Sequence, residues 1–135
     1  MDRERIVKIV SDIEKYMNDL DGMNIRKAED LTGIEKYYAT SMILFSLLNR
    51  VIDLAQEVVI GKKLGMPSSY KEIFRILCER DFISKETLGE IEKLVELRNI
   101  LSHEYYRIGS GEIFRAVKNV GVVRKFVSEI KRRIE

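Results

Sequence analysis

Apolar residues recur at intervals of three and four along almost the whole chain, and this helical period limits the possible folds more than any other feature. Residues 2–20 carry one apolar stripe, made of Ile6, Ile9, Val10, Ile13, Met17 and Leu20. No segment alternates apolar and polar residues between turn signals, as a half-buried strand would. Pro67 is the one proline among 135 residues, so little interrupts helix formation. The pattern predicts an all-α fold.

The first half of the chain divides at recognisable start and stop signals. Asp21-Gly22 is expected to end the first helix, and residues 23–31 form either a short helix or an irregular link. Thr32 and Glu35 have the spacing of a capping box for a long helix that runs to about Lys63. The middle of that helix is apolar almost all round, which predicts burial inside a bundle or at an interface.

The second half is expected to hold three more helices. Ser69, with Glu72 as its capping-box partner, begins a shorter one, and Ser84 caps the next. A loop at 109–111 precedes a last helix over residues 112–134. We therefore expect an antiparallel up-and-down bundle of four main helices plus one shorter helix, as a single domain over residues 1–135.

Several classes of site are excluded by composition. Cys78 is the only cysteine and His103 the only histidine, so neither an intrachain disulfide nor a zinc site built from thiolates or histidines is possible. Motifs for phosphate loops, dinucleotides and zinc proteases are missing, and we expect no metal and no cofactor. The charged N-terminus lacks a signal-peptide core and no apolar run is long enough to span a bilayer. We expect a cytoplasmic protein.

Charge is distributed unevenly although the net charge is only +2. Residues 105–135 carry 8 of the 24 basic groups and 3 of the 22 acidic groups. Such a basic segment either attracts phosphates or places cations near the C-terminal end of a solvated helix. The 34% of charged residues also suggests ion pairs on the helix faces.

A polar ridge interrupts the apolar long helix. Asn49, Asp53 and Glu57 follow one another at intervals of four, and Arg50 has the spacing to pair with Asp53. The ridge is either a solvated edge of the helix or a surface that faces a polar site and orients its basic groups.

The stretch RNILSHEYY, residues 98–106, holds the single histidine. On a regular helix Arg98 and His103 lie about 140° apart, so either the helix loosens near Ser102 or the two side chains reach a substrate from different directions. Two copies across a two-fold axis would bring four such groups together. An imidazole that transfers protons and an arginine that stabilises a phosphorane suit metal-free cleavage of RNA, whose 2′-OH is an internal nucleophile. A lone histidine near a helix end is, however, more often a cap or a packed side chain.

The motif also supplies a resemblance. Arg98, His103 and Tyr105 match the RX4HXY motif of HepT-like proteins in the HEPN superfamily. The Pro67, Tyr70 and Phe74 spacing, the Arg98-Asn99 pair and the run from Tyr105 to Ile108 also resemble that family, so the likeness extends over most of the chain.

The resemblance implies a metal-independent endoribonuclease of a type VII HepT/MntA toxin–antitoxin pair, acting on RNA as a homodimer. It implies that His103 is the general acid and base, that Arg98 binds phosphate, and that Asn99 and Asp53 support them. Arg107 would contact the RNA backbone. The implied partner is an MntA-type nucleotidyltransferase that neutralises the toxin by transferring AMP to Tyr105.

Two other interpretations stay open. The chain is alternatively a non-catalytic HEPN-type subunit that binds a nucleotide or docks a nucleotidyltransferase, or a structural helical dimer in which His103 is a cap. Asn49 also stands where many relatives of the family carry an acidic residue, which leaves the role of the polar ridge open. The apolar stretch ATSMILFSLL has more apolar surface than one partner face needs, which favours a dimer.

Overall fold

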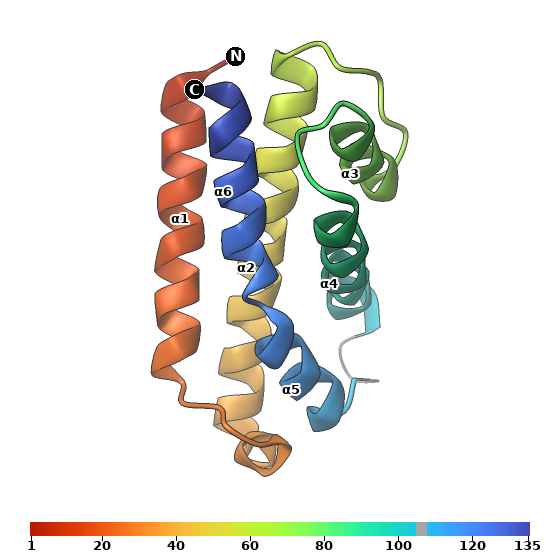
Figure 1. The fold of residues 1–135 in the computed structure, drawn as a ribbon. Coiled ribbons are helices and arrows are strands. Elements are labelled where there is room, and N and C mark those ends of the chain that lie inside the picture. Colours follow the sequence, from red (N-terminus) through yellow and green to blue (C-terminus); the bar gives the residue numbers. More distant parts are fainter. Residues whose placement is uncertain (105–107) are drawn as a thin grey trace.

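The computed structural model describes residues 1–104 and 108–135, which form a bundle of helices (Figure 1). The helices are α1 (Arg3–Gly22), the 3₁₀ helix η1 (Ala28–Leu31), α2 (Ile34–Gly61), α3 (Tyr70–Glu79), α4 (Lys85–Glu104), α5 (Ser110–Asn119) and α6 (Val122–Ile134). No strand occurs among the described residues. The predicted all-α class and helical bundle are confirmed. The predicted roles of Tyr105 and Arg107 fall outside the described residues.

The long helix α2 is the centre of the bundle and packs against α1, α3, α4, α5 and η1 (Figure 1). Helix α1 runs antiparallel to it, and near its beginning Arg5 Nε donates to Glu57 Oε2 close to the end of α2, at 2.9 Å. All six residues of the apolar stripe in α1 are buried. The period of three and four therefore identified the buried face of this helix correctly, because that face packs against α2.

The last helix is the main correction to the predicted bundle, since residues 110–134 form two helices instead of one. The amide of Asn119 donates to the backbone carbonyl of Arg115 at 2.9 Å and satisfies an acceptor at the end of α5. Gly121 follows, and glycine lowers helix propensity at the point of the break. As a result α5 packs against η1 and α2, while α6 packs against α4.

The predicted N-caps Ser69 and Ser84 are confirmed, although the Glu72 carboxylate accepts from the Ser68 N–H instead of the Ser69 N–H that a capping box would use. The Ser69 hydroxyl accepts from the backbone N–H of Glu72, and the Ser84 hydroxyl from that of Thr87. The capping box at Thr32 is wrong, because its hydroxyl donates to the carbonyl of Glu29 at the end of η1. Helix α2 accordingly begins one residue later than that box predicts, after Gly33, without a side-chain cap.

A carboxylate from α6 secures the beginning of α4. Glu129 Oε1 accepts from the Ser84 backbone N–H at 3.0 Å, and its Oε2 accepts from the Thr87 hydroxyl at 2.6 Å. Thr87 is fully buried. An acidic group at a helix N-terminus satisfies free N–H groups and interacts favourably with the helix dipole. This contact fixes the start of the helix that carries Arg98 and His103.

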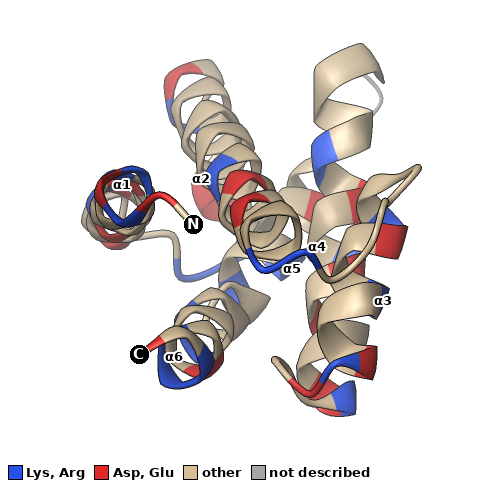
Figure 2. Cartoon of the chain, turned by 90° about the horizontal axis from the view of Figure 1, so that it is seen from above, with Lys and Arg blue, Asp and Glu red and all other residues tan. Residues whose placement is uncertain are grey.

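Charges of both signs occur along the helices, as Figure 2 shows from above. The last turn of α6 carries three basic residues, Lys131, Arg132 and Arg133. Cations at a helix C-terminus interact favourably with the negative end of the helix dipole. This placement favours the helix-end interpretation of the basic segment over a phosphate site. None of the described helices has the length and apolar character needed to cross a membrane.

Candidate functional site

Arg98 lies on α4, and side chains from two helices hold its guanidinium group. Its Nε donates to Asn49 Oδ1 on α2 at 2.6 Å, and its Nη1 donates to Asn99 Oδ1 at 3.1 Å. Two of the five guanidinium N–H donors are thereby used. The other three donors, including both on Nη2, have no hydrogen-bond acceptor among the described residues.

Two aromatic rings complete the surroundings of Arg98. The guanidinium carbon lies 5.1 Å from the ring centroid of Tyr70 on α3 and 5.6 Å from that of Phe45 on α2. A cation over an aromatic face is attracted by the electron-rich ring. Asn49, Phe45 and Tyr70 therefore form, with Asn99, a set of neutral contacts around the arginine.

No carboxylate pairs with Arg98 in the described part of the chain, because its hydrogen-bond acceptors are the two amides. The other arginine of this region differs, since Arg50 contacts Asp12 at 2.8 Å and Asp53 at 3.1 Å. Two carboxylates neutralise the charge of Arg50, whereas no described carboxylate pairs with Arg98. Arg98 is therefore better suited than Arg50 to bind an anionic ligand.

Each residue of the polar ridge of α2 contacts a different arginine. Asn49 contacts Arg98, Asp53 contacts Arg50, and Glu57 contacts Arg5. The predicted pair of Arg50 and Asp53 is confirmed. The structure brings Asn49 and Asn99 to Arg98 and places Asp53 against Arg50. Asn49 is the ridge residue that contacts Arg98, whereas Asp53 and Glu57 form ion pairs with arginines that connect α2 to α1, so a supporting role of Asp53 for Arg98 stays a prediction.

Arg50 also connects α2 to α1 through Asp12. The hydrogen bond from Lys8 lowers the pKa of Asp12 below its ordinary value, against a smaller opposite effect of desolvation, and Arg50 lowers it further. These contacts keep the Asp12 carboxylate charged and α1 in register with α2. They hold the scaffold beside the site rather than the site itself.

His103 lies in the last turn of α4 and is exposed. The helix continues to Glu104, so it does not loosen near Ser102, whose hydroxyl donates back to the Asn99 carbonyl at 2.8 Å. Five residues of regular helix turn His103 about 140° away from Arg98 and move it about 7.5 Å along the axis. One copy of the chain therefore presents the two side chains in different directions.

The chain that follows the motif is attached to the beginning of α2. The Tyr37 hydroxyl donates to the backbone carbonyl of Ile108, and the Ile108 side chain is buried. Burial raises the pKa of Tyr37 above its ordinary value. The hydroxyl therefore stays protonated as the donor. This contact joins Ile108, four residues after the end of α4 in the chain, to the first turn of α2.

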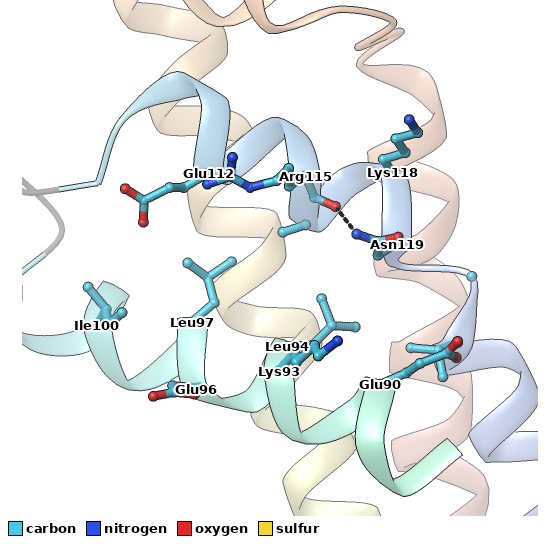
Figure 3. A pocket seen from close by; sticks show the side chains of 13 residues that line it. Glu90, Lys93, Leu94, Glu96, Leu97, Ile100, Glu112, Arg115, Lys118 and Asn119 are labelled. Atoms are coloured by element: carbon cyan, nitrogen blue, oxygen red, sulfur yellow. Dashed lines mark hydrogen bonds between the residues drawn. The ribbon is translucent and has the colours of Figure 1, made fainter. Parts of the chain in front are cut away.

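A hollow of about 640 Å³ between α4 and α5 is separate from the Arg98 surroundings (Figure 3). Its floor is apolar and includes Leu94, Leu97 and Ala116. Its charged residues are balanced, three basic (Lys93, Arg115 and Lys118) and three acidic (Glu90, Glu96 and Glu112). Because neither sign prevails, the hollow offers no preference for an anionic ligand.

Sequence reasoning missed two of the Arg98 contacts as parts of the site. Phe45 was expected only as an apolar residue of the long helix, and Tyr70 only as part of a family spacing. Both lie far from Arg98 in the chain, and no local pattern links them to it. Asn49 was identified, but its partner was not, since the ridge was equally compatible with a solvated edge.

Comparisons with known proteins bear on this arrangement. The family model described as ribonuclease HepT-like matches residues 6–130, nearly the whole chain. The chain belongs to the HepT-like ribonuclease family. The resemblance inferred from the Arg98, His103 and Tyr105 motif is confirmed at this level.

Two curated proteins are similar to this HepT-like chain over about half of their length. The putative RNase YutE of Bacillus subtilis is 28% identical over 72 residues, 53% of this chain and 50% of YutE. The mRNA nuclease HepT of Shewanella oneidensis is 28% identical over 68 residues, 50% of this chain and 51% of that protein.

Solved structures share the HepT-like fold over the full chain. The structure of Bacillus subtilis YutE has a TM-score of 0.87 at 24% identity and covers 100% of this chain and 92% of that one. The tri-AMPylated HEPN toxin of Shewanella oneidensis, in complex with MNT antitoxin, has a TM-score of 0.88 at 20% identity. The match covers 98% of this chain and 99% of that one.

Proposed function

We propose that this chain is a metal-independent endoribonuclease toxin, in which Arg98 and His103 cleave RNA. The observation that carries the proposal is the guanidinium of Arg98, which neutral groups hold in place and which pairs with no carboxylate in the described part of the chain. A held cation with free N–H donors is suited to a phosphate. The exposed imidazole at the end of the same helix supplies the proton-transfer group.

In the proposed reaction the 2′-OH attacks the adjacent phosphorus. His103 takes the hydroxyl proton, and Arg98 stabilises the charge of the phosphorane. The bond from phosphorus to the 5′ oxygen breaks, and that oxygen leaves with a proton returned by an imidazole. The products are a 2′,3′-cyclic phosphate and a 5′-OH end. No metal enters this sequence of steps.

The proposed partner is an MntA-type nucleotidyltransferase antitoxin that transfers AMP to Tyr105. Support comes from the HEPN toxin of similar fold, which is tri-AMPylated and in complex with MNT antitoxin. An AMP group two residues after His103 would add a negative charge and bulk where the substrate phosphate binds. The modified toxin would then be inactive.

We expect His103→Ala to lose RNA cleavage by about 10²–10⁴-fold, the usual contribution of general acid–base catalysis. Cleavage of a labelled mixed-sequence RNA in excess EDTA measures this, after mass spectrometry has confirmed that Tyr105 is unmodified. Because His103 is exposed, its replacement should leave the melting temperature unchanged. If unmodified wild-type protein leaves the RNA intact, the catalytic proposal fails and the non-catalytic docking subunit takes its place.

The proposed active form is a homodimer in which His103 of one copy acts near Arg98 of the other. The divergence of the two side chains on one helix supports this arrangement. A stripe of exposed apolar residues on α2 supplies a surface for it: Ile34, Tyr38 and Met42 are 68%, 50% and 63% exposed and follow one another every four residues. Tyr37, adjacent to this stripe in the chain, contacts Ile108, which follows the motif.

We expect Met42→Glu to convert the dimer to a monomer and to abolish RNA cleavage. A charge placed in an apolar interface is desolvated without a partner. Size-exclusion chromatography with light scattering measures the mass against the 15.8 kDa of one chain. Ile60→Glu is the matched control, because Ile60 is 58% exposed near the other end of α2 and should leave the dimer intact. A monomeric wild type that cleaves RNA would refute the shared site.

A further inference from the structure

We propose that Tyr70 is a positioning residue for Arg98, and that its ring keeps the guanidinium in the orientation that binds the scissile phosphate. The inference rests on the proposed function, in which Arg98 contacts that phosphate. Tyr70 touches Arg98 through its ring alone, with the guanidinium carbon 5.1 Å from the centroid. Its hydroxyl makes no hydrogen bond to the described residues.

The hydrogen bonds of Arg98 leave one motion of its guanidinium unrestrained. The bonds to Asn49 and Asn99 lie near the plane of the group and direct its Nε and Nη1. They resist tilting out of that plane only weakly. The guanidinium carbon lies over the rings of Tyr70 and Phe45, and contact with these rings opposes the tilt. Nη2 is thereby kept pointed in one direction.

The start of α3 holds the Tyr70 ring in place. Tyr70 is the first residue of that helix, directly after Ser69, whose hydroxyl accepts from the Glu72 backbone N–H at 3.2 Å. The Glu72 carboxylate accepts in turn from the Ser68 backbone N–H at 3.0 Å. The hydrogen bond from the Ser68 hydroxyl and then the one from this N–H lower the pKa of Glu72, so it stays charged at neutral pH. The ring therefore projects from a capped helix end rather than from a loose loop.

An aromatic ring is suited to this task because it stabilises a cation without neutralising it. A carboxylate in the same place would orient Arg98 equally well, but would compete with the substrate phosphate for its donors. Tyr70 is 37% exposed, so it borders the open side of the site rather than the core. The ring and the two amides together position Arg98 while leaving its charge available.

The test compares Tyr70→Leu with Tyr70→Phe in steady-state RNA cleavage. We expect Tyr70→Leu to lower kcat by about ten- to a hundredfold with a smaller change in KM, the cost of a misplaced catalytic group. Tyr70→Phe should retain wild-type kcat, because it keeps the ring. Tyr16→Leu is the matched control, since Tyr16 also lies under a cation, Lys15 at 5.4 Å, but on α1. A kcat for Tyr70→Leu equal to that of wild type would overturn the proposal.

A second measurement does not depend on activity. The NMR signal of the Arg98 Nε–Hε group reports both the hydrogen bond to Asn49 and the ring current of Tyr70. We expect a shifted, slowly exchanging proton in wild type and Tyr70→Phe, and a fast-exchanging one in Tyr70→Leu. An unchanged signal in Tyr70→Leu would overturn the positioning role. If wild type cleaves no RNA, the proposed function fails by itself, and this signal alone decides whether Tyr70 holds Arg98.

Discussion

Replacing Arg98 with lysine should lower kcat for RNA cleavage by about 10²–10³-fold, the usual loss when one donor that stabilises transition-state charge is removed. Lysine keeps the positive charge but lacks the planar fork of donors. It has no Nε to donate to Asn49. Its single ammonium group also cannot contact the neutral groups that surround Arg98 and at the same time present two N–H groups to a phosphate. The loss should appear mainly in kcat, because the interaction strengthens as charge develops.

Arg75→Lys is the matched control for that substitution. Arg75 lies on α3, its side chain is 59% exposed, and it contacts Glu92 at 3.7 Å, an ion pair of the kind that contributes little. Both variants are assayed on unmodified protein, with thermal unfolding to confirm the fold. Equal activity of Arg98→Lys and wild type would show that the positive charge suffices for cleavage and that the neutral contacts around Arg98 do not contribute to it.

Replacing Phe126 with alanine should lower the free energy of unfolding by about 3–5 kcal/mol, the cost of a large cavity. Phe126 is fully buried on α6 and meets Phe74 of α3, with ring centroids 5.6 Å apart and the planes at 61°. Edge-to-face pairs of this kind are more stable than their buried area alone predicts. The substitution therefore removes apolar contacts at the point where α3 and α6 meet.

Urea unfolding monitored by circular dichroism measures this loss, with the slope of the transition expected to stay constant. Phe126→Leu retains most of the volume and should cost only about 1–2 kcal/mol. A double-mutant cycle with Phe74→Ala should give a coupling of about 0.5–1.5 kcal/mol between the rings. An alanine variant as stable as the leucine variant would mean that the surrounding helices collapse into the cavity.

The helices could be predicted from the sequence because they depend on residues close together in the chain. The apolar stripe of α1 and the caps at Ser69 and Ser84 each involve residues within a turn or two of one another. The same reasoning failed where a local signal had two uses. Thr32 had the right spacing to cap α2, yet its hydroxyl donates to the Glu29 carbonyl in η1. The apolar period over residues 112–134 likewise did not reveal the break between α5 and α6.

The sequence by itself determined the helical class, the buried faces and the motif that contains Arg98 and His103. Only the tertiary structure decided what surrounds Arg98, because Asn49 lies 49 residues away in the chain and Tyr70 belongs to a separate helix. The physical reason is the range of the interactions. Helix period and capping arise within a few residues, whereas a neutral cage around a cation forms only when α2, α3 and α4 pack together and bring distant side chains into contact.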